Sequence, residues 1–259
     1  MLTKLKFLFE LIIFYLINFI VFYGSEKILR YLTNDTEYNI SIHILIIIIF
    51  VFSNIIVINI GLFYQKETLA NVCLKNKKKL KIWVSVFLCT MGYIILSYYL
   101  RDFLYWIFSG FEMFPYSDGI NGINILFVIQ TCLIPAVGEE IIIKGIINTR
   151  LEKQFNRKVA VIISSLFFSL EHLSLELFIH YFIFSIFTFW IYFKTKTILL
   201  PMFVHFINNI FAYDIFYGIF KIPHIYFIAI IIFLIGLFAI IKTTENEGKK
   251  SNNKINILK

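Results

Sequence analysis

The sequence is poor in the residues that form disulfide frameworks, turns and linkers. Its 259 residues include only 3 cysteines, 4 prolines and 11 glycines. Cys73, Cys89 and Cys132 lack the regular spacing of small secreted domains, so we expect unpaired thiols. The scarcity of glycine and proline argues against low-complexity linkers, and the sequence has no glycine-rich phosphate-binding loop. We therefore expect one folded domain rather than several domains joined by flexible segments.

Charged residues are also scarce, at 15% of the chain, whereas hydrophobic residues make up 59% and aromatic residues 19%. The mean hydropathy is +0.82. A soluble domain of this length cannot bury so much apolar surface. The composition excludes a soluble globular protein and predicts an integral membrane protein that contacts the lipid bilayer.

Long apolar runs recur along the sequence. A helix needs roughly 20 apolar residues to cross the hydrocarbon of a bilayer. Membrane β-strands would alternate apolar and polar residues over about ten positions, and these runs do not alternate. The sequence therefore predicts an all-α fold, a polytopic transmembrane bundle of about eight helices. The predicted segments are Phe7–Tyr23, Ile44–Tyr64, Ile82–Leu100, Ile123–Ile147, Val159–Leu173, Leu175–Phe193, Ile198–Phe216 and Ile225–Ile241.

The net charge of +8 is concentrated beside these segments. Basic residues accumulate on the cytoplasmic side of membrane proteins. With eight crossings and a cytoplasmic N-terminus, the main basic clusters all fall on that side, and the acidic residues of loop 101–121 fall on the other. Because topology explains the basic charge, we expect no nucleic-acid partner. The clusters lie at residues 66–81, 150–158, 194–196 and from 242 onward.

This topology places both termini in the cytoplasm. We expect a single membrane domain over residues 1–242, with any catalytic motifs within 123–213, and a polar cytoplasmic tail over residues 243–259. The abundance of Ile, Lys, Asn and Phe is compatible with a bacterial plasma membrane. Nothing in the sequence predicts an oligomeric state.

The second half of the chain carries polar residues inside apolar segments. Glu139 and Glu140 lie in the fourth segment, and a charged carboxylate near a bilayer centre costs about 2.5 to 3.5 kcal/mol. His172 ends the fifth segment, and His205 and Asn209 lie in the seventh. Counted from the nearest basic residues, Glu139, His172 and His205 are roughly 15, 21 and 14 Å deep. We expect the fourth, fifth and seventh helices to form one polar pocket.

Such a pocket contains what hydrolysis of an amide requires. A carboxylate can act as general base on water, and a histidine can bind that water or carry its proton. His205 and Asn209, four residues apart and on one helix face, can donate hydrogen bonds to the oxyanion of a tetrahedral intermediate. No serine or cysteine nucleophile is needed.

Three short motifs resemble those of the CAAX protease and bacteriocin-processing family (CPBP, or Abi) of intramembrane proteases. Residues 139–145, EEIIIKG, resemble the family's EExxxR motif followed by glycine. Residues 168–172 resemble FxxxH, and residues 205–209 resemble HxxxN. Each motif is weak alone, but their order and spacing on apolar helices make a more specific signal. The resemblance implies an intramembrane endopeptidase.

The resemblance also implies roles for matching residues. Glu139 would be the catalytic base and His172 its partner in activating water, with His205 and Asn209 beside the oxyanion. Glu140 would pair with the basic residue of the motif. This chain has Lys144 where the family usually has arginine, and lysine cannot form the planar bidentate pair with a carboxylate. The substitution either leaves a simple Glu140–Lys144 ion pair or marks an inactive site.

The sequence does not decide between possible cofactors and partners. Two histidines and a glutamate can bind catalytic zinc, with Glu139, His172 and His205 as the ligands here, but the sequence has no HExxH motif. We favour a mechanism without a required metal, with zinc as the alternative. The expected partner is a peptide or membrane-protein substrate, either a prenylated CAAX protein or a bacteriocin-type peptide.

Other functions also fit some of these residues. A purely structural reading treats the acidic pair and Lys144 as an ion-pair network that locks helices together. A second is a catalytically impaired family member that acts as a membrane binding or bacteriocin self-immunity protein. A third is an ion-coupled carrier, which duplicated halves would favour, and the first three segments contain no comparable polar set.

Overall fold

The computed structural model describes residues 9–16, 20, 40–65, 78–109, 125–212, 222 and 224–257. Every regular element within these ranges is a helix. The predicted all-α class is therefore confirmed for the described part of the chain. The longer helices are α2 (Ile40–Gln65), α4 (Leu80–Phe108), α8 (Arg157–Glu171), α9 (Phe178–Thr195), α10 (Leu199–Ala212) and α12 (Ile225–Ile257).

From Ile125 to Glu152 the backbone is helical without a break and contains two π-helical segments. The register alternates between α-helix and the rarer π-helix, in which each turn holds more residues. This run carries the two glutamates of interest. Its parts are α5 (Ile125–Val128), η1 (Ile129–Leu133), α6 (Ile134–Glu140), η2 (Ile141–Asn148) and α7 (Thr149–Glu152).

Four described helices are long and apolar enough to cross a membrane: Ile44–Phe63, Leu80–Phe108, Phe178–Thr195 and Ile225–Glu247. They correspond to the second, third, sixth and eighth predicted segments. α8 and α10, the fifth and seventh, are shorter, with 15 and 14 residues. The first segment, Phe7–Tyr23, lies mostly outside the described residues, although residues 9–16 are helical. The count of eight stays a prediction.

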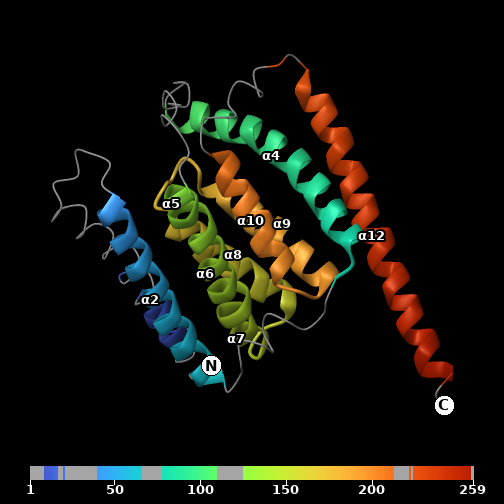
Figure 1. Ribbon diagram of the computed structural model, residues 1–259, viewed down its shortest axis with the longest axis horizontal. Coiled ribbons are helices and arrows are strands. Elements are labelled where there is room, and N and C mark those ends of the chain that lie inside the picture. Colours follow the sequence, from blue (N-terminus) through green and yellow to red (C-terminus); the bar gives the residue numbers. More distant parts are fainter. Residues whose placement is uncertain are drawn as a thin grey trace.

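Figure 1 shows a central group of helices with further helices packed on either side of it. α2 lies on one side, the α4–α12 pair lies on the other, and α5 to α10 lie between them. Large apolar side chains cover the outer faces, and Phe63 and Phe238 are 81% and 64% exposed. Such surfaces suit hydrocarbon rather than water. The chain is an integral membrane protein.

Helices α4 and α12 run antiparallel in close contact (Figure 1). Lys78 pairs with Glu247 at one end, with Nζ 2.8 Å from Oε2. Glycine permits this contact, because a Cβ added at Gly92 would lie 2.7 Å from the carbonyl oxygen of Ala229. α12 continues past position 243 to Ile257, so the predicted polar tail begins as an extension of this helix.

One end of the helix group collects basic side chains. The Arg157 guanidinium, at the start of α8, lies 4.9 Å from the centre of the Phe193 ring near the end of α9. α4 begins beside Lys78 and Lys79, and α9 ends beside Lys194 and Lys196. We call this the basic end.

Candidate active site

Glu140 and Lys144 form a fully buried ion pair one helical turn apart. Lys144 Nζ lies 2.6 Å from Glu140 Oε2, and the two side chains are 0% and 1% exposed. The same ammonium donates a hydrogen bond to Thr188 Oγ1 of α9 at 2.9 Å. It also lies 4.5 Å from the centre of the Phe189 ring, within the range of a cation–π contact. Thus lysine, in place of the family's arginine, still pairs with the second glutamate.

The backbone around this pair is unusual. The π-helix η2 starts at Ile141, directly after Glu140, and π turns inside α-helices often accompany functional sites. Gly138, which precedes the two glutamates, faces α2, and a Cβ added there would collide with Asn54 Oδ1. α2 can therefore pack directly beside the acidic pair only because residue 138 has no side chain.

His205 connects α10 to both glutamates. Its ring is 2% exposed, and Nδ1 lies 3.2 Å from Glu140 Oε1. Because an ionised carboxylate oxygen can only accept, Nδ1 is the donor in this hydrogen bond. The other ring nitrogen, Nε2, lies 3.8 Å from Glu139 Oε2. Glu140 thus binds a lysine through one oxygen and orients a histidine through the other.

Glu139 has a different environment from its neighbour. Its side chain is 13% exposed, compared with 1% for Glu140. The buried Oε2 atom of Glu139 makes no hydrogen bond with the part of the chain that the structure describes. The acidic pair is therefore divided into one carboxylate held by the protein and one whose oxygen faces His205.

His172 follows the last residue of α8 and is fixed on two sides. Its Nδ1 lies 2.9 Å from the Phe168 carbonyl oxygen, which can only accept, so Nδ1 carries a proton and the lone pair of a neutral ring is on Nε2. Its ring stacks on Tyr181 with centroids 3.8 Å apart. The Phe168 ring contacts both histidines, with centroids 4.7 Å from His172 and 5.6 Å from His205.

Asn209 lies one turn beyond His205 on α10. Its Nδ2 donates a long hydrogen bond of 3.5 Å to the carbonyl oxygen of Cys132 in η1. This contact attaches α10 to the helical run of the two glutamates at a second point. One of the two amide hydrogens is used there, which leaves the other for a different acceptor.

The structure brings most of the predicted site residues together. Glu139, Glu140 and Lys144 contact one another or His205 directly. His172 joins them through the Phe168 ring. Sequence reasoning missed Thr188, Phe189 and Tyr181, which are supplied by α9. Of these three, only Thr188 stands out in the sequence, as a hydroxyl within an apolar helix, and this indication is weak.

The predicted zinc ligands do not converge in this arrangement. Within the described ranges no three His, Cys, Asp or Glu side chains lie close enough together to hold a metal ion. The Nδ1 atoms of His172 and His205 donate to protein oxygens, which leaves each Nε2 as the nitrogen that could bind a ligand. The residues as placed do not fit a three-ligand zinc site, so we derive no catalytic step through a metal.

Comparison with known families bears on the same part of the chain. Residues 121–211 match the family model for type II CAAX prenyl endopeptidase Rce1-like proteins. This segment is Rce1-like. The match confirms the CPBP family predicted from the three motifs. No curated protein and no solved structure matches the chain.

The Rce1-like segment contains the glutamates, His172, His205 and Asn209, together with α9. It runs from α5 to α10, the helices that lie between α2 and α4 in Figure 1. α2, α4 and α12 lie outside it and pack around it. The Rce1-like match over this segment supports a membrane protease of the CAAX endopeptidase type.

Proposed function

We propose that this protein is an intramembrane endopeptidase in which Glu139 activates water to hydrolyse a peptide bond. The observation that carries the proposal is the division of the acidic pair. Glu140 is occupied by Lys144 and His205, whereas Glu139 Oε2 lies 3.8 Å from His205 Nε2 without a hydrogen bond to the described protein. A general base needs an oxygen that can accept a proton from water, and Glu139 has one.

In the first step a water molecule gives a proton to the Glu139 carboxylate while its oxygen attacks the carbonyl carbon of the scissile bond. His172 assists, because the lone pair on Nε2 can accept a hydrogen bond from the same water. The bond from Nδ1 to the Phe168 carbonyl keeps this tautomer in place. Tyr181, stacked on the ring, limits its rotation.

The attack turns the carbonyl oxygen into an oxyanion, which needs hydrogen-bond donors. Asn209 can supply an N–H, and His205 can supply a second from Nε2. Since Nδ1 of His205 donates to Glu140, Nε2 carries a proton only when the ring is an imidazolium. The carboxylates beside both ring nitrogens are the groups that stabilise this positive charge.

The tetrahedral intermediate then collapses. The carbon–nitrogen bond breaks, and the leaving nitrogen takes the proton that Glu139 accepted from water. The products are a peptide with a new carboxylic acid, which keeps the second proton of the water, and a peptide with a new amine, and Glu139 returns to its ionised form. The balance requires water alone and no protein nucleophile.

The substrate class follows from the family. We propose a peptide or the tail of a membrane protein that enters from the cytoplasmic side, with both termini of the enzyme on that side. A prenylated CAAX protein is favoured by the Rce1-like match, and a bacteriocin-type peptide is the alternative. The basic end described above supports this orientation, because basic residues mark the cytoplasmic face.

The test is cleavage by the full chain, purified and reconstituted in liposomes. A panel of S-farnesylated CAAX peptides and bacteriocin-type leader peptides is incubated with wild type, Glu139→Gln and Lys144→Arg, each with and without a chelator. Glu152→Gln is the matched control, because Glu152 pairs with Arg157 at the basic end, away from the site.

Cleavage by wild type and Glu152→Gln, with loss in Glu139→Gln, supports the proposal. If the chelator abolishes cleavage, the enzyme requires a metal ion. Cleavage by Lys144→Arg but not by wild type would identify a catalytically impaired family member. If no variant cleaves any peptide, the binding or self-immunity function is favoured.

A further inference from the structure

The N-terminal helical segment, residues 9–16, packs against the Rce1-like segment although it lies outside it. Its inward side chains include Leu11 and Tyr15, which are 0% and 7% exposed. Both belong to the same apolar core as buried residues of η2 and α8. Near the start of the segment, Glu10 Oε2 lies 3.6 Å from Arg150 Nη2 in α7. The segment is therefore attached to the helical run that carries the two glutamates.

Tyr15 connects this segment to the end of α8. Its hydroxyl donates to the Phe167 carbonyl oxygen at 2.8 Å, and the rings of the two residues lie 4.7 Å apart between centroids. The next carbonyl oxygen along α8, that of Phe168, binds Nδ1 of His172 at 2.9 Å. Two consecutive carbonyl groups of α8 are thus bound by side chains, one from the N-terminal segment and the other from the histidine of the candidate active site.

The end of α8 is a place where such support matters. The last carbonyl groups of a helix have no donor within the helix, and α8 ends directly before His172. The backbone N–H of His172 bonds to the Ser169 carbonyl oxygen at 3.4 Å, one residue closer than in an α-helix. Leu173 then has a φ of 48°, in the left-handed region that bulky residues rarely adopt. The regular helix therefore does not hold His172, whose position depends on the last turn of α8.

We propose that Tyr15 is a positioning residue for His172, so that the N-terminal helical segment forms part of the active site. The proposal rests on the proposed protease function. By holding the last turn of α8, the Tyr15 hydroxyl fixes the Phe168 carbonyl group that keeps the proton of His172 on Nδ1. The lone pair of Nε2 then stays directed at the attacking water. Without the hydroxyl the turn can move, and the imidazole can take its other tautomer or rotate.

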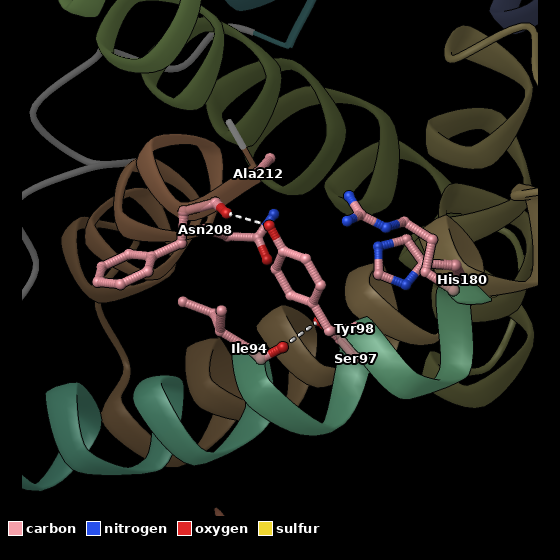
Figure 2. Close-up of a pocket in the computed structure, with 8 residues that line it drawn as sticks. Ile94, Ser97, Tyr98, His180, Asn208 and Ala212 are labelled. Atoms are coloured by element: carbon pink, nitrogen blue, oxygen red, sulfur yellow. Dashed lines mark hydrogen bonds between the residues drawn. The ribbon is translucent and has the colours of Figure 1, made fainter. Parts of the chain in front are cut away.

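Tyr98 of α4 offers a matched control. It is 4% exposed, and its hydroxyl donates to the Phe211 carbonyl oxygen of α10 at 2.9 Å. Figure 2 shows this bond beside a small cavity of about 20 Å³ among α4, α9 and α10. Tyr98 and Tyr15 are thus both buried and both bind a backbone carbonyl group of another helix. Tyr98→Phe therefore removes the same kind of hydrogen bond as Tyr15→Phe, but at a helix that does not carry His172.

The first experiment compares steady-state cleavage by wild type, Tyr15→Phe and Tyr98→Phe, each as the full chain in liposomes with a peptide that wild type cleaves. We expect Tyr15→Phe to lower kcat about 2- to 12-fold, the range for one neutral hydrogen bond, with KM unchanged. Tyr98→Phe should lower the unfolding temperature by a similar amount but leave kcat within about twofold of wild type. An unchanged kcat in Tyr15→Phe, or equal decreases in the two variants, would overturn the proposal.

A spectroscopic measurement separates this proposal from the protease function. The chain has 5 histidines, so NMR of the protein with ¹⁵N-labelled histidine rings gives few resonances, and His172→Gln identifies those of His172. In Tyr15→Phe the His172 resonances should broaden or move toward the average of the two tautomers, whereas in Tyr98→Phe they should match wild type. This result would support the role of Tyr15 even if no peptide is cleaved. Unchanged His172 resonances in Tyr15→Phe would refute it even if wild type is an active protease.

Discussion

Lys144 Nζ donates a hydrogen bond to Thr188 Oγ1 across the boundary between η2 and α9, at a distance of 2.9 Å. Thr188 in turn donates to the Ser185 carbonyl oxygen at 2.9 Å. The hydroxyl therefore accepts from the buried ammonium while it is held by its own helix. The Lys144 ammonium is thus contacted by the Thr188 hydroxyl, the Glu140 carboxylate and the Phe189 ring.

Thr188→Val should destabilise the protein because it keeps the shape but removes the acceptor for Lys144. We expect a loss of about 1 to 3 kcal/mol in the free energy of unfolding, and Thr188→Ser should restore most of it. Thermal unfolding of the reconstituted protein measures the effect. Thr195→Val is the control, because that buried hydroxyl donates to the Ile191 carbonyl oxygen within its own helix, α9. Equal losses in the two valine variants would contradict the role of Thr188.

Glu139→Gln and Glu140→Gln should separate activity from stability. Glu140 is half of a buried ion pair, and removal of one partner costs about 3 to 5 kcal/mol. Glu139 makes only a longer contact of 3.8 Å with His205, and its Oε2 atom accepts no hydrogen bond from the described part of the chain, so Glu139→Gln should abolish cleavage while the unfolding temperature stays at or above that of wild type. Cleavage assays and thermal unfolding on the same preparations measure the effects on activity and on stability. Strong destabilisation by Glu139→Gln would show that this carboxylate also holds the fold.

Tyr181 should act as a positioning residue for His172. The two rings stack with centroids 3.8 Å apart, and such contacts are worth about 0.5 to 1.5 kcal/mol. Tyr181→Leu should therefore lower kcat about 2- to 12-fold with little change in KM, whereas Tyr181→Phe keeps the ring and should stay near wild type. Steady-state cleavage of a fluorescent peptide separates kcat from KM. A fall in kcat for Tyr181→Phe would assign the function to the hydroxyl instead.

Gly138→Ala should push α2 away from the acidic pair. The added Cβ would collide with Asn54, whose Nδ2 bonds to the Phe50 carbonyl oxygen and so has little freedom to move. Crowding of this kind costs about 1 to 3 kcal/mol. The second change Asn54→Ala should recover most of that loss, and thermal unfolding of the single and double variants tests it. If Asn54→Ala gives no recovery, the two residues do not meet.

The sequence predicted the helices and most of the site, and its failures have physical causes. Ile123–Ile147 was predicted as one helix, and the structure has helix from Ile125 to Glu152. The π turns within it were not predictable, because they depend on the hydrogen-bonding register rather than on the side-chain pattern. α9 begins at Phe178 and not at Leu175, since the Ser174 hydroxyl accepts from the Leu177 backbone N–H and forms a turn.

For the site, the motifs predicted which residues take part and in what order, but not which side chains contact one another. The pairing of Glu140 with Lys144 followed from their spacing of one turn. The link from Glu140 to His205, and the supporting residues on α9, depend on how distant helices pack. His180 lies inside the apolar helix α9 and matches none of the three motifs. Its place beside Arg101 became visible only in the folded chain.

The contacts around Lys144 also bear on how this protein can change during evolution. An arginine at position 144 would bring a longer, planar group into a space already bounded by Thr188 and Phe189. It would need a smaller or repositioned neighbour on α9 before it could pair with Glu140. Substitutions at positions 144 and 188 are therefore expected to arise together among descendants of this chain, and a change at either one alone should be selected against.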